Sequence, residues 1–190
     1  MRRVVELLAR LQAVCPDFTL EVNLSGRSIG DPDLERTLVD ALGAHDVDPS
    51  GLVLEVTETA AVANVQVARG FAERVSALGC RFALDDFGAG FGSFYYLKHL
   101  KFDFVKIDGE FVSHSNANAT DRAIMQSIVG ITHGLGKRAV AEFVSDPEIY
   151  DVVLEEGVDL AQGYYIGRPV PVEEFLESLL ADPAPYDAGR

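Results

Sequence analysis

The sequence predicts an α/β fold in which parallel strands are covered by helices. Short runs rich in β-branched and aromatic residues alternate with longer amphipathic runs along most of the 190 residues. This alternation is typical of βα units, which place their strands in one parallel sheet. Three helical runs end in a glycine directly before the next strand, at Gly79, Gly136 and Gly157. We expect these glycines to adopt positive φ as helix C-caps.

The expected elements follow one another as strand and helix from one end of the chain to the other. Residues 1–14 predict an amphipathic helix, because Glu6 and Arg10 interrupt the apolar stretch that a signal peptide would need. The strand candidates are Phe18–Asn23, Leu52–Val56, Arg81–Leu84, Phe102–Ile107, Arg138–Glu142 and Asp159–Gln162. The other helix candidates are Pro32–Ala44, Asn64–Leu78, Ser93–Leu100, Thr120–Leu135, Pro147–Glu155 and Val172–Leu180.

Two arrangements of these units compete, an open doubly wound sheet and a (β/α)₈ barrel. No glycine-rich phosphate loop follows the first strand, so a dinucleotide-binding sheet gains little support. About six βα units are two fewer than a closed barrel requires, and typical barrels need ~250 residues. We expect one domain over residues 1–181 and a disordered, proline-rich tail at 182–190.

The overall composition excludes several kinds of partner. A net charge of −14 argues against non-specific binding to DNA, RNA or acidic lipid, which needs a basic surface. No apolar run reaches the ~20 residues of a membrane-spanning helix. Cys15 and Cys80 form no paired motif, so we expect a reducing, cytoplasmic location. Acidic clusters can still hold divalent cations, and these cations can hold a phosphate ligand.

Polar side chains stand at the carboxyl ends of the expected strands. In a barrel these ends meet on one face, which is where barrel active sites are built. The residues predicted to share that face are Asn23, Glu55, Glu58, Asp85, Asp86, Lys106, Asp108, Glu142 and Gln162.

Carboxylates gathered in this way repel one another, and a divalent cation relieves the repulsion. Oxygen ligands suit Mg²⁺ or Mn²⁺, whereas no His or Cys at a strand end points to zinc. Two such cations suit in-line displacement at phosphorus, with a free carboxylate taking the proton of water. A functional role is the favoured interpretation for Lys106 and Glu142, because charged residues are rare in buried strands. For Glu58 and Asp108 a helix cap is an equally good interpretation, and Asn23 could belong to a turn.

Several motifs occur in an order and spacing similar to those of the EAL domain family. They are VNLS at 22–25, LEVTE at 54–58, LDDFGAG at 84–90, VKID at 105–108, AE at 141–142 and QGYYIGRPVP at 162–171. The chain resembles this family from about residue 4 to about residue 180. The resemblance implies a modified, TIM-like (β/α)₈ barrel that hydrolyses cyclic di-GMP to pGpG with two Mg²⁺ or Mn²⁺ ions. It also implies a possible homodimer and a possible sensory or GGDEF partner domain.

The resemblance assigns a role to each matching residue. Lys106 would position the catalytic water or phosphate, and Glu142 would be the base-like acid. Residues 86–94 would form a loop that links metal binding to dimer packing. The implied metal ligands are Asn23, Glu55, Asp85 and Asp86. The implied substrate-binding or loop residues are Glu58, Asp108, Gln162, Phe87, Gly88 and Gly90.

The chain departs from the family pattern in three ways. The loop reads DDFGAGFGSF, where the family pattern is nearer DDFGTGYSS. The Glu-Ala-Leu strand with its metal-ligand Glu is absent, together with the strand before it, so we expect an incomplete barrel that lacks its first strands. A motif of the AEGVE type reads AEFVS, with Phe143 for Gly and Ser145 for the second Glu. The missing strands have three explanations: a chain that starts too late, which we favour, an edge covered by another protein or copy, or a decayed remnant.

Three functions remain open. The first is a cyclic di-GMP phosphodiesterase, impaired in this chain by the lost carboxylates. The second is an inactive EAL domain that binds cyclic di-GMP or a partner protein. The third, which the motif context disfavours, is a barrel enzyme in which Lys106 removes a proton beside a carboxylate.

Overall fold

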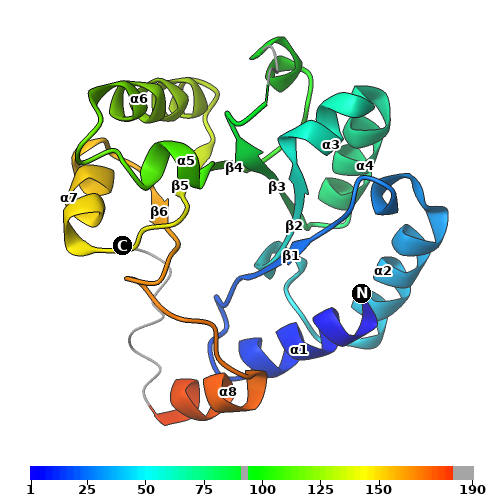
Figure 1. Cartoon of the computed structure of the whole chain (residues 1–190). Helices are drawn as coiled ribbons and strands as arrows, with labels where there is room; N and C mark the ends of the chain where they lie inside the picture. Colours follow the sequence, from blue (N-terminus) through cyan, green and yellow to red (C-terminus); the bar gives the residue numbers. More distant parts are fainter. Residues whose placement is uncertain (91–93, 182–190) are drawn as a thin grey trace.

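Six parallel strands form a curved sheet that makes half of a barrel, with helices on its outer side (Figure 1). The computed structural model describes residues 1–90 and 94–181. The strands are hydrogen-bonded in chain order, so each βα unit adds the next strand to the same edge. They are β1 Leu20–Asn23, β2 Leu52–Thr57, β3 Arg81–Phe87, β4 Phe104–Ile107, β5 Arg138–Ala141 and β6 Leu160–Ala161. The incomplete barrel expected from the sequence is therefore present.

The helices follow the expected order, with three differences. Two short helices are present that the sequence did not predict: α3, which precedes the helix capped by Asn64, and α5, which follows β4. The helix expected at Ser93–Leu100 is a short 3₁₀ turn, η3. The helices are α1 Arg2–Gln12, α2 Pro32–Ala44, α3 Glu58–Ala63, α4 Val65–Ala77, α5 Gly109–Val112, α6 Ala119–Gly134, α7 Pro147–Glu155 and α8 Val172–Ala181, and the 3₁₀ turns are η1 Ser28–Gly30, η2 Pro49–Gly51 and η3 Phe94–Lys98.

The three glycines at the helix-to-strand junctions have the expected backbone. Gly79, Gly136 and Gly157 have φ of 89°, 69° and 71°, in the left-handed region that glycine enters without a steric penalty. Each lets the chain turn sharply from a helix into the following strand. Residues 91–93 of the expected loop and the expected tail at 182–190 lie outside the described residues. Within the described residues, no helix combines the length and the apolar character needed to cross a bilayer.

The two faces of the sheet carry different side chains because successive residues of a strand point to opposite sides. The outer face packs against the helices in the main core, to which Leu54, Leu84 and Ile107 contribute. The inner face holds a smaller apolar layer made of Val53, Ala83, Phe104, Val140 and Leu160. Along β2, β3 and β4, and directly after β5, the next position after this layer carries a charge, at Glu55, Asp85, Lys106 and Glu142.

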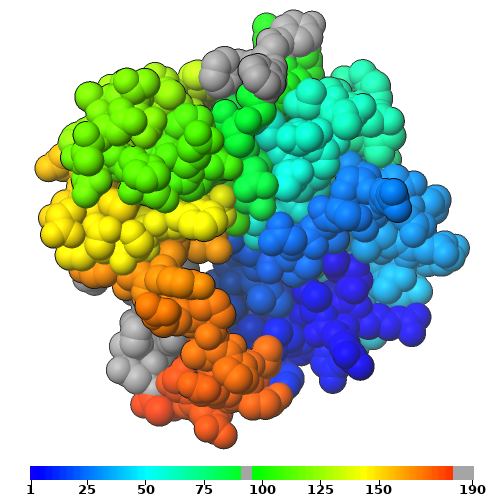
Figure 2. All heavy atoms as spheres, in the orientation of Figure 1, coloured from blue at the N-terminus to red at the C-terminus, as the bar shows by residue number. Residues whose placement is uncertain are grey.

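The half-barrel has two strand edges that no described residue pairs, because β1 bonds only β2 and β6 bonds only β5. Helices α1 and α8 lie side by side across the gap between these edges (Figure 1). The contact between these helices is apolar and is formed by the buried side chains of Leu11, Leu176 and Leu179. Beside it, Arg10 forms an ion pair with Glu173 at 2.9 Å. A cavity of about 680 Å³ opens inside the gap, between N-terminal (blue) and C-terminal (orange) segments in Figure 2.

Replacing Leu179 by alanine is expected to lower the free energy of unfolding by about 2 kcal/mol, at the lower end for buried leucines. Leu179 is fully buried in the α1–α8 contact, whereas its neighbour Leu180 is 65% exposed. Leu180→Ala is therefore a matched control that should change stability little. Urea unfolding of both variants measures the difference. Equal midpoints would show that α8 does not pack on α1 in solution.

Candidate metal and phosphate site

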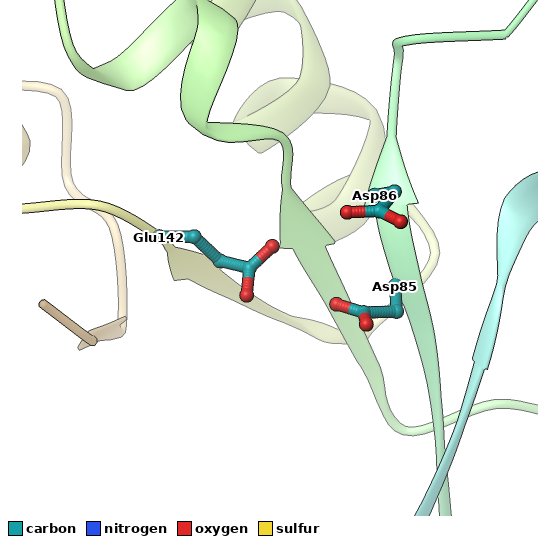
Figure 3. Close-up of side chains that lie close together, drawn as sticks. All are labelled: Asp85, Asp86 and Glu142. Atoms are coloured by element: carbon teal, nitrogen blue, oxygen red, sulfur yellow. The ribbon is translucent and has the colours of Figure 1, made fainter. Parts of the chain in front are cut away.

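Three carboxylates converge at the carboxyl ends of β3 and β5. Asp85, Asp86 and Glu142 each offer one oxygen, and these oxygens lie within 4.8 Å of one another. In Figure 3 the Glu142 side chain points toward Asp85 and Asp86, which lie on β3. Asp85 and Glu142 are buried, and Asp86 is exposed. The three acids thus form one group that is open to solvent on the Asp86 side.

A local irregularity in β3 lets two consecutive aspartates join the same group. In a regular strand Asp85 and Asp86 would point to opposite faces. The pairing of β3 with β4 shifts register between Leu84 and Phe87, as at a β-bulge. Asp86 itself has φ of 51°, in the left-handed region that aspartate tolerates better than most side chains. The bulge re-aims one side chain, which is a common role of bulges beside functional sites.

Lys106 on β4 is the only ammonium that contacts this group within the described residues. Its Nζ lies 2.6 Å from Glu55 Oε2, 3.0 Å from Glu142 Oε1 and 3.2 Å from Asp85 Oδ1. All four side chains are almost completely buried. Because several carboxylates surround one ammonium, the site holds an excess of potential negative charge.

The pKa values reflect this crowding. Burial raises the pKa of Glu55 to about 7, against the opposing effect of its hydrogen bond with Lys106. Burial also raises the pKa of Glu142 to about 7, and repulsion from Asp85 adds to the shift. Burial lowers the pKa of Lys106, but the hydrogen bond and charge of Glu55, together with the charges of Glu142 and Asp85, outweigh it, so the net shift is upward. The ammonium therefore stays charged, while two carboxylates titrate near neutral pH.

The donor set fits a hard divalent cation. Asp85 Oδ1 is buried and accepts no hydrogen bond, although it lies at ion-pair distance from Lys106. A buried carboxylate oxygen without a hydrogen bond is costly, and a metal ion would satisfy it. All donors in the group are oxygens, which Mg²⁺ and Mn²⁺ prefer. The group could therefore hold such a cation.

The other two residues implied as metal ligands, Asn23 and Glu55, lie on β1 and β2 and are not among the three converging acids. Asn23 on β1 is the register partner of Glu55 on β2, so the two are adjacent at the same level of the sheet. Glu55 is bonded to Lys106 and is not one of the three converging acids. Glu142, which the sequence suggested as a base, is one of them. Gln162 follows β6 and lines the large cavity.

Glu58 has a positioning role that the capping interpretation does not describe. It begins α3, but Thr57 caps that helix. The buried Glu58 side chain accepts hydrogen bonds from Tyr96 Oη at 2.7 Å and from the Gly88 amide at 3.0 Å. Burial and the neighbouring Glu58 raise the pKa of Tyr96, so its hydroxyl stays protonated as the donor. Glu58 thus anchors the backbone two residues after Asp86.

Replacing Glu58 by alanine should loosen the chain after β3. Alanine removes both carboxylate oxygens, so the Tyr96 hydroxyl and the Gly88 amide each lose their acceptor, at a cost of about 1–3 kcal/mol for a buried donor. The protection of the Gly88 amide against hydrogen exchange should fall. Tyr96→Phe is the control, since it removes only the hydroxyl and should leave Gly88 protected. If Gly88 keeps full protection in Glu58→Ala, then Glu58 does not anchor that segment.

The other implied loop residues have structural roles. Asp108 accepts a hydrogen bond from the Glu110 amide at 2.7 Å and caps α5, as the capping interpretation expects. Phe87 is buried and pairs with Ile107 across β3 and β4. Gly88 has φ of 103°, and a side chain there would meet the Phe111 ring. A Cβ on Gly90 would lie 3.5 Å from Glu58 Oε2.

Sequence reasoning missed Tyr96, which completes the buried network through Glu58. It placed the aspartate pair after a strand, whereas β3 continues through Phe87, because Phe87 still pairs with Ile107 beyond the bulge. A tyrosine on a short turn gives no pattern that points to a particular carboxylate. The bulge likewise has no signal in the letters DD, which are equally typical of a turn.

The sequence model of the family described as the EAL domain matches residues 1–169 of the chain. The chain belongs to the EAL domain family. Cyclic di-GMP phosphodiesterase PdeB of Shewanella oneidensis is 40% identical over 161 residues, 85% of this chain and 19% of the relative. Cyclic di-GMP phosphodiesterase PdeF of Escherichia coli is 32% identical over 179 residues, 94% of this chain and 24% of the relative. This EAL chain therefore spans about a fifth to a quarter of the length of these relatives.

Solved EAL structures share the fold. The EAL enzyme Bd1971, in a form with cAMP and cyclic di-GMP bound, is 27% identical with a TM-score of 0.87, over 94% of this chain and 50% of that one. The PaMucR phosphodiesterase in complex with c-di-GMP is 31% identical with a TM-score of 0.83, over 92% of this chain and 72% of that one. The half-barrel described here thus corresponds to part of each of these solved chains.

Proposed function

We propose that this EAL chain provides the metal-binding face of a cyclic di-GMP phosphodiesterase, which opens one phosphodiester bond to give pGpG. The observation that carries the proposal is the convergence of Asp85, Asp86 and Glu142 within 4.8 Å, beside the ammonium of Lys106. The names of the PdeB and PdeF relatives and the ligands of the two solved structures support cyclic di-GMP as the substrate.

Each residue has a chemical task in this proposal. Asp85 and Asp86, together with Asn23 and Glu55 on β1 and β2, would hold Mg²⁺ or Mn²⁺ ions. When bound, such ions polarise the phosphate and lower the pKa of a bound water. The Lys106 ammonium is placed to neutralise charge on a phosphoryl oxygen. Glu142 can accept the proton of the attacking water, because a pKa of about 7 suits proton transfer near neutrality.

A second candidate is a binding module without turnover, and two observations favour it. Lys106 already neutralises part of the carboxylate group through three ion pairs. Ser145, which stands where the family motif has a second glutamate, donates its hydroxyl to Asp146 at 2.8 Å. Asp146 in turn caps α7, so Ser145 contributes to a helix end and adds no carboxylate to the site.

The two candidates are separated by measuring binding and hydrolysis on the same samples. Cyclic di-GMP is incubated with the chain and Mg²⁺ or Mn²⁺, pGpG is followed by chromatography, and binding is followed by calorimetry. A chimera is assayed in parallel, in which the residues that precede the matched region of the Shewanella relative are joined to Met1 to pair the open edge. We expect the chimera to bind metal more tightly and to hydrolyse faster than the chain alone. Binding without pGpG in both would support the binding module and reject the enzyme.

A further inference from the structure

Phe143 has an unusual conformation directly after a site residue. Its φ is 56°, in the left-handed region that is unfavourable for bulky side chains. Its side chain is 65% exposed, although an aromatic ring gains most from burial. Residues held in a strained conformation persist where the surrounding structure fixes them, and they gather at ligand sites. Phe143 thus combines backbone strain with an exposed ring next to Glu142.

The backbone around Phe143 is fixed on both sides. The Val144 amide donates to the Gln162 carbonyl at 3.0 Å, and the Val144 carbonyl accepts from the Tyr165 amide at 3.0 Å. On the other side, the Glu142 amide donates to the Ile107 carbonyl at 3.4 Å. These bonds tie the segment to β4 and to the chain after β6. The ring therefore has a defined position.

The ring packs on backbone along only part of its surface. A Cβ at Gly109 would collide with the Phe143 ring, so only glycine allows the two segments to lie this close. Gly109 directly follows Asp108 at the end of β4, as Phe143 follows Glu142 at the end of β5. The ring consequently lies on the rim of the acidic group, between two neighbouring strand ends.

Nearby exposed aromatic side chains already have partners. Tyr165 packs against Tyr150 with ring centroids 5.6 Å apart, and Arg168 lies 4.7 Å from the centroid of Tyr164. Among the described residues, no other ring or cation stacks on Phe143. Its free surface is therefore available to a flat ligand group.

We propose that Phe143 is a stacking residue for a purine base of the nucleotide whose phosphate lies at the acidic group. The inference rests on the proposed function for the position of the phosphate. A purine offers a large π-face to an exposed ring, and base–aromatic stacking needs no particular hydrogen-bond pattern. Metal ions at the acids would attract a nucleotide phosphate to the same rim, whereas the acids themselves would repel an acidic peptide.

Phe143→Gly tests the ring without endangering the fold. Glycine adopts φ of 56° freely, so this variant removes the ring and relieves the strain together. Its thermal midpoint should equal or exceed that of the unaltered chain. Its affinity for cyclic di-GMP and for GMP, measured by calorimetry in Mg²⁺, should fall roughly 5- to 150-fold. Ribose 5-phosphate, which has no base, should bind both proteins equally, and Phe143→Tyr should keep the nucleotide affinity.

A tryptophan at this position provides a direct optical test. The chain contains no Trp, so Phe143→Trp introduces a single indole. Its fluorescence should be quenched by GMP, because guanine stacks on indole and quenches it, and should not respond to ribose 5-phosphate. If neither the chain nor the chimera hydrolyses cyclic di-GMP but GMP binding depends on Phe143, the proposed function is rejected and this inference stands.

Three outcomes would overturn the stacking role. The first is unchanged nucleotide affinity in Phe143→Gly, including the case in which cyclic di-GMP is still hydrolysed. The second is an equal loss of nucleotide and ribose 5-phosphate binding, which would mean that the whole site is disturbed. The third is a change from dimer to monomer in Phe143→Gly without a change in nucleotide affinity, which would assign the ring to a protein contact.

Discussion

Replacing Asp85 by asparagine is expected to abolish metal-dependent hydrolysis of cyclic di-GMP while leaving the fold intact. Asparagine keeps the shape of the side chain but removes its charge, and its amide binds divalent cations more weakly than a carboxylate does. Changes outside the ligand set already cost 10- to 100-fold in metal affinity or activity, so loss of a ligand should cost at least about 100-fold.

The same substitution should not destabilise the metal-free protein. Asp85 repels Glu55 and Glu142 and raises the pKa of each, so removing its charge relieves part of the crowding. The attraction between Asp85 and Lys106 is lost, but Lys106 keeps its ion pairs with Glu55 and Glu142, and Asp85 Oδ1 accepts no hydrogen bond that could be lost. We therefore expect an equal or higher midpoint of urea unfolding in the absence of metal, together with weaker Mg²⁺ binding by calorimetry.

Asp40→Asn is the matched control for Asp85→Asn. Asp40 is an exposed aspartate on α2, and its replacement removes the same charge from a different face. It should leave Mg²⁺ affinity and pGpG formation unchanged. These measurements use the chimera with the paired edge if the chain alone has no measurable turnover. Full activity in Asp85→Asn would exclude Asp85 as a metal ligand.

Much of this arrangement could be predicted from the sequence because its causes are local. Alternation of strand and helix patterns fixes the order of the sheet, and Gly79, Gly136 and Gly157 fix three of the junctions. The parallel order then brings strand ends together, which is why Glu55, Asp85, Lys106 and Glu142 could be expected at one mouth. Their roles as ligands or base remain predictions until the variants are measured.

Other features depend on contacts between distant segments and have no local signal. The choice of Glu55 as the shortest ion-pair partner of Lys106 depends on how β2 and β4 curve across β3. The hydrogen bond from Tyr96 to Glu58 joins residues far apart in the chain. The left-handed backbone of Phe143 is set by bonds to β4 and to the segment after β6. The only local signal at that position is the phenylalanine itself, which replaces the glycine of the family motif.

Replacing Lys106 by methionine should destabilise the metal-free chain by about 3–5 kcal/mol at pH 8, the usual consequence of removing one partner of a buried ion pair. Methionine fills similar volume but leaves Glu55, Asp85 and Glu142 without their shared ammonium. Urea unfolding at several pH values measures the loss. Lys101→Met, at an exposed position, is the control and should have little effect.

The loss of stability in Lys106→Met should grow as the pH rises. The pKa of Glu55 and that of Glu142 already lie near 7, above the ordinary value of 4.5, and Lys106 holds both down. Without the ammonium both pKa values rise further. A carboxyl group with a raised pKa in the folded state favours folding below its ordinary value, and this contribution is lost as pH rises through the folded pKa. The variant should therefore be closer to the unaltered chain at pH 5 than at pH 8.

Two changes should restore part of the stability of Lys106→Met at pH 8 if buried negative charge causes the loss: added Mg²⁺ and a second substitution. Mg²⁺ should recover part of the stability, because a cation would replace the lost ammonium among the acids. Glu55→Gln should also recover part of it, because Glu55 is the carboxylate nearest to the missing ammonium, at 2.6 Å. A Lys106→Met variant that is equally unstable at pH 5 and pH 8, and that neither change improves, would mean that Lys106 stabilises the inner face by packing alone.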